Sequence, residues 1–309
     1  MRTAYLEIVQ DCNLNCSFCS QGDRRGIRPL PELKAFIDKS RAEKFEKLMI
    51  TGGEPLLHPQ LEEIITYATG IGLLVGLQTN GTLMTAEKTE DLHKAGLDHV
   101  FFSIHSHIPE VVDDLMCGKG VLKHQLSGLE NTKKSGIMTF ITTVVNKKNF
   151  SHLPEFFEFM TGSYPHITHY VLNFVDAVGR SSGNPGIVPR YSEVELPLFR
   201  ALDLLKRAGK SFRVERVPIC YMLEFAEHST ELLRLVTPEI NLAYREDEFS
   251  AFTPVYFRER YEHAPACETC SFKAICPGLA KAYVSIHGNS EVYPLFVSPQ
   301  LVIKKADGD

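Results

Sequence analysis

The sequence predicts an α/β fold, an incomplete barrel of six β-α units over residues 1–209, followed by a small cysteine-rich extension over residues 210–309. Three observations support this. Short apolar runs alternate with amphipathic helical segments through the first two thirds of the chain, which is typical of parallel β-α units. This alternation stops near Lys210. Six of the eight cysteines fall into two tight groups near opposite ends of the chain.

Each predicted strand is followed by a segment with apolar residues at steps of three and four, the period of an amphipathic helix. The predicted strands are Ala4–Val9, Lys47–Ile50, Leu73–Thr79, His99–Ile104, Thr139–Val145 and His169–Phe174. The predicted helices are Leu33–Glu43, Pro59–Thr69, Ala86–Ala95, Val121–Ser135, Leu153–Met160 and Glu193–Ala208. Six units imply a partial (β/α)6 TIM-like barrel, with functional sites where the strands end. The Gly-, Ser- and Pro-rich segment Gly179–Pro189 is predicted to be a loop that could fold over the barrel mouth.

Composition is that of an ordinary globular protein, with 309 residues, 44% hydrophobic and 23% charged. No apolar run approaches the roughly 20 residues of a membrane span, and no signal peptide precedes the first strand, so we expect a cytoplasmic protein without a membrane partner. A formal charge of -5 makes nucleic acid an unlikely partner. Arg24, Arg25 and Arg28 form either a solvated loop or a patch for an acidic peptide segment or a phosphate.

The first cysteine group directly follows the first predicted strand, where Cys12, Cys16 and Cys19 have the spacing CxxxCxxC. Three thiolates so close together can bind one cubic iron–sulfur cluster and leave one iron without a protein ligand. A structural zinc site needs a fourth ligand, and the neighbouring residues offer no good substitute for a thiolate. The spacing therefore favours an iron–sulfur cluster over zinc or free buried cysteines.

A glycine-rich loop, Thr51-Gly52-Gly53-Glu54-Pro55, follows the second predicted strand. Its two glycines let the backbone approach a ligand closely, and Glu54 supplies an anionic acceptor. Together and in this order, the cysteine loop and the GGE loop resemble those of the radical S-adenosylmethionine (SAM) enzymes. The resemblance implies a [4Fe-4S] cluster on the three cysteines, SAM at the open iron, and the methionyl amino group of SAM at Gly52, Gly53 and Glu54.

The same resemblance implies further SAM contacts beside the cluster and at strand ends. These candidates are Phe18, Gln78, Asn80, Ser103 and Asn146. Each has a simpler explanation, since Asn80-Gly81 also suits a tight turn and Ser103 a strand terminus. His105 could contact a substrate or act as an acid or base, although a lone loop histidine more often does neither.

The second cysteine group contains Cys267, Cys270 and Cys276, a set that zinc or a second iron–sulfur cluster could use. Its surroundings resemble the shortened C-terminal cluster segment of peptide-modifying radical SAM maturases, such as those of the His-Xaa-Ser systems. The resemblance implies one auxiliary cluster with Cys220 as its fourth ligand. Because the segment departs from the seven-cysteine SPASM pattern, we do not expect two auxiliary clusters. Cys117 is expected to be a semi-buried free thiol, with a role as catalytic hydrogen donor as the alternative.

The resemblance further implies that a reductant such as flavodoxin or ferredoxin supplies one electron. SAM is then cleaved to methionine and a 5'-deoxyadenosyl radical, which takes a hydrogen atom from the substrate. The substrate is expected to be a ribosomally made peptide; the alternatives are a small molecule, such as a nucleotide, cofactor or natural-product precursor, and a non-enzymatic zinc-binding scaffold. Because the first strand begins near Met1, a peptide is expected to need either a separate leader-binding protein or a direct grip by the barrel and the extension.

Overall fold

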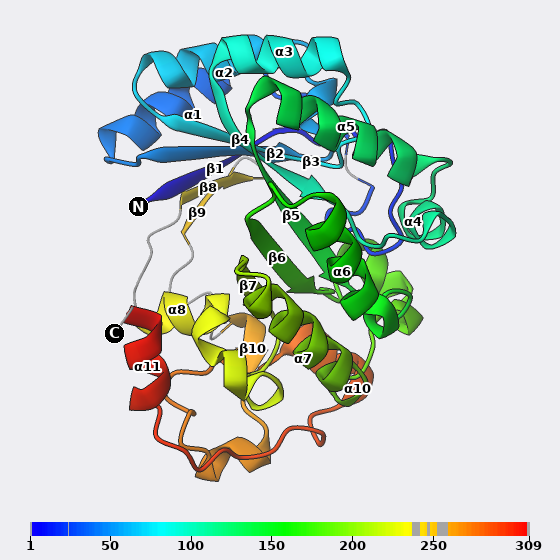
Figure 1. The fold of residues 1–309 in the computed structure, drawn as a ribbon. Coiled ribbons are helices and arrows are strands. Elements are labelled where there is room, and N and C mark those ends of the chain that lie inside the picture. Colours follow the sequence, from blue (N-terminus) through cyan, green and yellow to red (C-terminus); the bar gives the residue numbers. More distant parts are fainter. Residues whose placement is uncertain (1, 24, 237–241, 246–247, 252–258, 308–309) are drawn as a thin grey trace.

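The computed structural model describes residues 2–23, 25–236, 242–245, 248–251 and 259–307. A curved nine-stranded sheet runs through the molecule in the order β7-β6-β5-β4-β3-β2-β1-β8-β9 (Figure 1). Its strands are β1 (Thr3–Val9), β2 (Lys47–Gly52), β3 (Leu74–Thr79), β4 (Leu97–Ser103), β5 (Met138–Val145), β6 (His169–Phe174), β7 (Ser211–Glu215), β8 (Leu242–Arg245) and β9 (Glu248–Ala251). All neighbouring strands are parallel except β8 and β9, which are antiparallel. The predicted α/β partial barrel is confirmed, and it does not close.

The sheet contains strands that the sequence prediction missed. β7 pairs in parallel with β6 beyond Lys210, where we expected the β-α pattern to stop, so the barrel has seven parallel strands from β1 to β7 rather than six. This strand is short, and only Phe212 and Val214 are buried, whereas the alternate positions are polar. A five-residue strand with one polar face carries too weak an apolar signal to be recognised.

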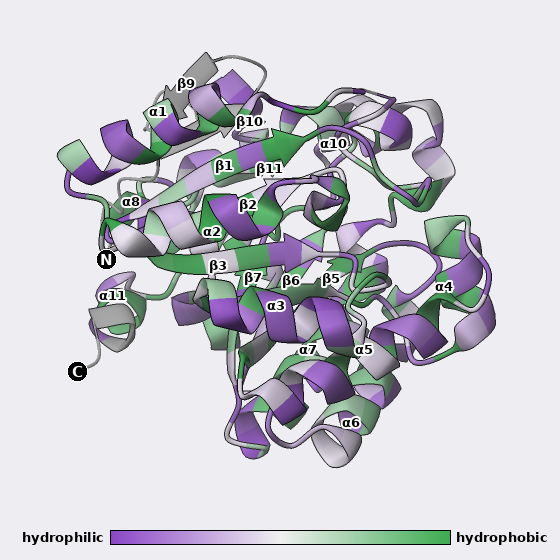
Figure 2. Ribbon diagram, turned by 90° about the horizontal axis from the view of Figure 1, so that it is seen from above, coloured by the Kyte–Doolittle hydropathy of each residue, from purple (hydrophilic) through white to green (hydrophobic). Residues whose placement is uncertain are grey.

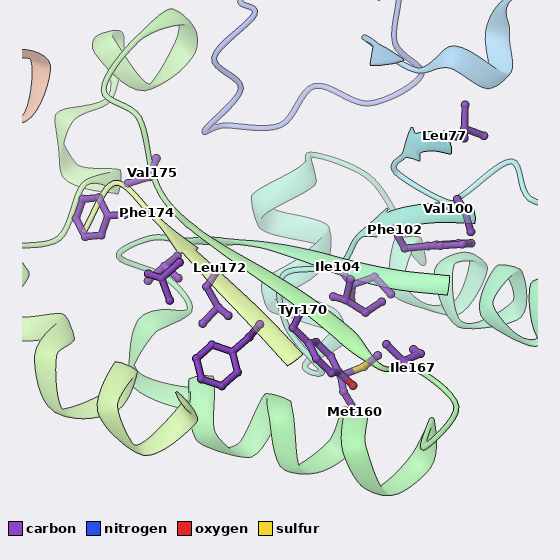
Figure 3. Packing of buried hydrophobic residues seen from close by; sticks show 14 of the residues in the cluster. Leu77, Val100, Phe102, Ile104, Met160, Ile167, Tyr170, Leu172, Phe174 and Val175 are labelled. Carbon is purple, nitrogen blue, oxygen red and sulfur yellow. The ribbon is translucent and has the colours of Figure 1, made fainter. Parts of the chain in front are cut away.

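Helices cover the outer face of the sheet and pack on its apolar residues. They are α1 (Leu30–Ala42), α2 (Leu61–Gly70), α3 (Ala86–Ala95), α5 (Val121–Ser135), α6 (Leu153–Ser163) and α7 (Tyr191–Arg207). Helix α4 (Pro109–Met116) lies beyond the strand ends, and α8 (Thr230–Val236) follows β7. α1 and α3 carry hydrophilic residues among hydrophobic ones, as expected of amphipathic helices (Figure 2). Figure 3 shows this core from close by, with Leu172 and Phe174 of β6 on the side that faces the helices.

The C-terminal segment lies beside α7 and α8 (Figure 1). It contains the two-stranded ribbon of β10 (Tyr261–Glu262) and β11 (Leu279–Ala280), and the helices α10 (Lys281–His287) and α11 (Gln300–Asp307). Phe272, Leu295 and Val302 form a second small apolar cluster with Ile219. Within the described residues, no helix combines the length and apolar character needed to cross a membrane.

Candidate active site

A cavity of about 890 Å³ lies at the carboxyl ends of the strands, the position expected for a site in a partial barrel. It is large enough for a cofactor together with a substrate. Most of the sequence-predicted residues line it, namely Cys12, Cys16, Phe18, Cys19, Gly52, Gly53, Gln78, Asn80 and Ser103. The structure therefore brings the cysteine loop, the glycine loop and the ends of β3 and β4 together around one space.

The cysteine loop is held from one side by the segment after β6. In the 3₁₀ turn Gly179–Gly183, the Arg180 amide donates to the Cys19 carbonyl at 2.9 Å, and the Ser181 hydroxyl donates to the Phe18 carbonyl at 3.1 Å. Gly179 has φ +62, and a Cβ there would lie 2.5 Å from the Ser20 carbonyl oxygen. This segment was predicted to fold over the barrel mouth; it packs against the cysteine loop, and glycine permits the close contact.

Helix α4 holds the loop from another side, and the sequence analysis did not predict this helix. The amides of Asn15 and Ser17 donate to the carbonyls of Met116 and Leu115 at 3.4 and 2.9 Å. Cys117 follows directly, with a left-handed φ of 51, and its side chain is exposed rather than semi-buried as expected. The exposure follows from its place at the C-terminal end of the helix.

The three thiols of the loop share one wall of the cavity. Burial raises the pKa of Cys12 and of Cys16, and the neighbouring cysteines raise both further. The Leu14 amide and the Asn80 side-chain amide lie 3.5 and 3.9 Å from the Cys12 sulfur. The raised pKa values of Cys12 and Cys16 mean that these two thiols are costly to ionise without a cation, so this donor set fits a positively charged iron centre.

The glycine loop is in direct contact with the cysteine loop. The Gly53 amide donates to the Val9 carbonyl at 2.7 Å, and the Glu54 amide donates to the Asp11 carbonyl at 2.9 Å. A Cβ on Gly53 would lie 2.3 Å from the Asp11 carbonyl oxygen, and one on Gly52 would lie 2.3 Å from that of Val9. Only glycine allows the two loops to approach this closely.

Glu54 occupies a different place from the one the sequence suggested. Its carboxylate is fully buried and accepts hydrogen bonds from the Thr79 hydroxyl, the Asn80 amide and the Leu56 amide at 2.7, 2.8 and 3.1 Å. Burial raises its pKa to about 7. Glu54 is not among the residues that line the cavity, whereas Gly52 and Gly53 are. The carboxylate therefore fastens β2 to the end of β3, and the glycine backbone faces the cavity.

Asn146 also lies away from the cavity, because the turn after β5 uses its side chain. The amide nitrogen donates to the Val144 carbonyl at 2.9 Å, and the amide oxygen accepts from the Lys148 amide at 3.0 Å. The residues of β5 that line the cavity are instead Thr142 and Val144. We therefore revise the expectation that Asn146 contacts SAM.

The arginine group behind the cysteine loop does not form one exposed patch. Arg28 is 8% exposed and lies 3.6 Å from the buried Glu7 carboxylate. Arg25 lines the cavity and lies 3.7 Å from Asp11, and Arg24 lies outside the described residues. Because Arg28 is buried beside Glu7, we do not expect it to bind an anion at the protein surface.

His105 lines the cavity and is fixed by strand β5. Its Nδ1 accepts the Val144 amide at 3.1 Å, which places the ring hydrogen on Nε2, and its ring packs edge-on against Phe18 with centroids 4.7 Å apart. Burial lowers its pKa to about 3, so the ring is neutral at physiological pH. A neutral histidine in a fixed position is better suited to donate a hydrogen bond than to act as an acid or base.

The sequence analysis missed the wall formed by β6, β7 and α8. Its residues are Asn173, Asp176, Arg180, Glu215, Arg216 and Glu231. Alternation in β6 was a usable signal, because Asn173 lies between the core residues Leu172 and Phe174 and must point to the opposite face. No comparable signal marks Glu231, which the chain brings back to the cavity after β7.

The second cysteine group forms a separate, smaller site. Cys220, Cys267, Cys270 and Cys276 all line one cavity, as the prediction of a four-thiol set requires. Burial raises the pKa of Cys220 to about 12 and that of Cys276 to about 11. The Leu295 amide donates to the Cys270 sulfur at 3.4 Å. Like the first group, this one combines converging thiols with an apolar surround.

Comparisons with known proteins agree with this geometry. The sequence profile of the radical SAM superfamily matches residues 6–160, about half of the chain. An AdoMet-dependent heme synthase of Methanosarcina barkeri is 36% identical over 157 residues, 49% of this chain and 45% of that protein. PqqA peptide cyclase of Gluconobacter oxydans is 26% identical over 155 residues, 49% of this chain and 43% of that protein. The chain thus spans less than half the length of these two relatives.

A solved structure extends the likeness to nearly the whole fold. Streptococcus suis SuiB bound to its precursor peptide SuiA superposes with a TM-score of 0.68 and 15% identity, covering 96% of this chain and 75% of SuiB. At this identity the likeness concerns the fold, and it includes the region beyond residue 160.

Proposed function

The chain belongs to the radical SAM superfamily, and from this premise we propose that it is an enzyme that modifies a ribosomally made peptide by radical chemistry. Enzymes of this family use a [4Fe-4S] cluster and SAM. When bound, these groups would supply a 5'-deoxyadenosyl radical, formed by one-electron cleavage of SAM, that takes a hydrogen atom from the substrate. Cys12, Cys16 and Cys19 would hold the cluster, and the backbone of Gly52 and Gly53 would bind the amino group of SAM.

The observation that carries this proposal is the shared cavity. The three thiols, the glycine loop and the ends of β3 and β4 line one side of it, and β6, β7 and the C-terminal segment line another. SAM at the first side would therefore face a substrate at the second. Phe18, Gln78, Asn80 and Ser103 line the cavity and are proposed as further SAM contacts.

Each cysteine group lines one cavity, with three thiols at the first site and four at the second. Thiolates are the usual ligands of iron–sulfur clusters, and zinc is the alternative at the second site. We propose an auxiliary cluster on Cys220, Cys267, Cys270 and Cys276.

Two observations support a peptide substrate. SuiB, which shares the fold, was solved with a precursor peptide, and the partial barrel is open at its edges, so an extended chain can enter. We further propose that residues 210–309, although they supply β7 to the barrel sheet, form the functional unit that holds the auxiliary cluster beside the cavity. A flavodoxin or ferredoxin would supply electrons, and a separate leader-binding protein would help to present the peptide.

A small-molecule substrate is the second candidate, because the relative with 36% identity is a heme synthase. The two can be separated by incubating the anaerobically loaded enzyme with SAM, reductant and precursor peptides encoded near its gene, and recording peptide mass and 5'-deoxyadenosine. We expect a mass change in a peptide. If no peptide changes, with or without candidate partner proteins, while a metabolite is converted and stimulates 5'-deoxyadenosine formation, the small-molecule function replaces the peptide function.

A further inference from the structure

The wall of the cavity at the β6–β7 edge of the sheet carries hydrogen-bond acceptors that the protein does not fill. Asn173 and Glu215 are register partners on β6 and β7. Because Leu172 and Phe174 point toward the helices (Figure 3), Asn173 points into the cavity. Glu231, near the start of α8, reaches the same wall, and its Oε1 accepts the Arg216 amide at 2.9 Å.

Two acceptor atoms on this wall lack partners among the described residues. They are the amide oxygen Oδ1 of Asn173 and the second carboxylate oxygen, Oε2, of Glu231. Both atoms are buried, and the Glu231 side chain as a whole is only 5% exposed. Burying an acceptor without a donor costs about 1–3 kcal/mol, so such atoms in a cavity wall indicate that a ligand supplies the donors.

The charges around this wall favour a donor-bearing ligand over an anion. Burial, followed by the nearby Glu215 carboxylate, raises the pKa of Glu231 only to about 6, so its Oε2 is largely an ionised acceptor at neutral pH. Asp176 adds another carboxylate. Arg216 is already engaged, since its Nε donates to the Phe174 carbonyl at 2.9 Å and its Nη1 lies 3.7 Å from Glu215.

The remaining charged residues of this wall do not reverse that balance. They are Arg180, Arg234, Glu259, Arg260 and Lys281. Arg180 donates to the Asp23 carboxylate from Nε and Nη2 at 3.0 and 2.7 Å. Arg234, Arg260 and Lys281 each interact with other residues of the protein, and Glu259 is exposed. A phosphate or carboxylate in this position would meet Asp176, Glu215 and Glu231 and would leave the two free acceptors unfilled.

We propose that Asn173 and Glu231 form a substrate subsite for a nitrogen group with several N–H donors, such as the ammonium, guanidinium or amide group of a peptide side chain or terminus. The inference rests on the proposed function, because it names the chemistry of the substrate in the same cavity. The subsite fixes the orientation of the substrate relative to the cysteine loop at the other side.

The test uses three probes with the same backbone and different side chains: Nα-acetyl-lysine dimethylamide, Nα-acetyl-glutamine dimethylamide and Nα-acetyl-glutamate dimethylamide. Their shared backbone carries no terminal amide with N–H groups, so only the lysine and glutamine side chains offer several N–H donors. Their dissociation constants are measured by NMR titration of the anaerobically loaded enzyme with SAM. We expect the lysine and glutamine probes to bind and the glutamate probe not to bind. Glu231→Gln, which keeps an acceptor for the Arg216 amide, should raise the dissociation constant of the lysine probe at least tenfold. The matched control Glu259→Gln, at an exposed carboxylate of the same cavity, should leave it unchanged.

The thermal midpoint of Glu231→Gln without probe distinguishes a binding role from a structural one. Since the substitution removes a buried charge with one unpartnered oxygen, the midpoint should equal or exceed that of the wild type. The subsite would be overturned by a clear fall in the thermal midpoint of Glu231→Gln or by an unchanged dissociation constant of the lysine probe in this variant. Tight binding of the glutamate probe to the wild type, or no binding of any probe, would also overturn it. Iron content and SAM cleavage of the same preparations test the proposed function separately: a chain that contains no iron but binds the donor probes through Glu231 refutes that function and keeps the subsite.

Discussion

Replacing Gly53 by alanine tests whether the contact between the glycine loop and the cysteine loop builds the site. The new Cβ would lie 2.3 Å from the Asp11 carbonyl oxygen and 2.6 Å from that of Gln10, both backbone atoms that cannot rotate away. The two loops would have to separate, straining the Gly53-to-Val9 and Glu54-to-Asp11 hydrogen bonds. Overpacking costs about 1–3 kcal/mol and each backbone hydrogen bond about 0.5–1.5 kcal/mol, so we expect a loss of about 2–6 kcal/mol.

The assay for Gly53→Ala is the thermal midpoint together with the iron content after anaerobic reconstitution. We expect the midpoint to fall by about 3 °C or more and iron loading to decrease, because Cys12 directly follows the displaced Asp11. Gly162→Ala is the matched control: this glycine lies in α6 with no atom within 4 Å of an added Cβ, so alanine should stabilise the protein by about 0.4–1 kcal/mol. Wild-type midpoint and iron content in Gly53→Ala would refute the reasoning.

Three further predictions follow from the site. The triple variant Cys12→Ala, Cys16→Ala, Cys19→Ala should lose about four irons per chain and keep the iron of the second site; a wild type that contains zinc and no iron would contradict this. Glu54→Ala leaves three donors without an acceptor, at about 1–3 kcal/mol each, so calorimetry should show a lower thermal midpoint. The SAM dissociation constant should rise at least about tenfold, because Gly52 and Gly53 lose the buried anchor that fixes their backbone at the cavity; an unchanged midpoint would contradict the buried network. Burial lowers the folded-state pKa of His105 to about 3, so the unfolded chain binds the proton first and the free energy of unfolding falls as the pH decreases below about 6.5. Between pH 7.5 and 5.5, His105→Gln should therefore lose about 1 kcal/mol less of this free energy than the wild type in denaturant titrations. Equal losses would contradict the assignment of a neutral, buried His105.

Local patterns in the sequence were sufficient to predict six of the seven parallel barrel strands. β6 was predicted with its observed bounds, because a buried face alternating over six residues is a strong signal. The cysteine and glycine loops were placed correctly at one cavity, since they follow neighbouring parallel strands whose ends meet at one edge. These inferences depend on short-range periodicity and on the rules of parallel sheets, both of which can be read from the sequence.

Side-chain direction at the strand ends could not be predicted in the same way. Glu54 and Asn146 both follow a strand as polar residues, and both turn away from the cavity to satisfy backbone donors and acceptors nearby. Glu231 reaches the cavity only because the chain after β7 folds back beneath it. Such contacts depend on tertiary packing, which produces no periodic pattern in the amino-acid sequence.

The contact between the turn Gly179–Gly183 and the cysteine loop has a consequence for how the protein matures. Arg180 and Ser181 bond to Cys16, Phe18 and Asp23 across 157 to 164 positions of the chain. Because a nascent chain emerges with its N-terminus first, Cys12, Cys16 and Cys19 leave the ribosome long before their support has been translated. Contacts at such separation also form slowly, since a long loop must close first. We therefore expect the iron centre to be delivered to the chain after translation has passed the sixth β-α unit, and the exposed thiols to need a reducing environment until then.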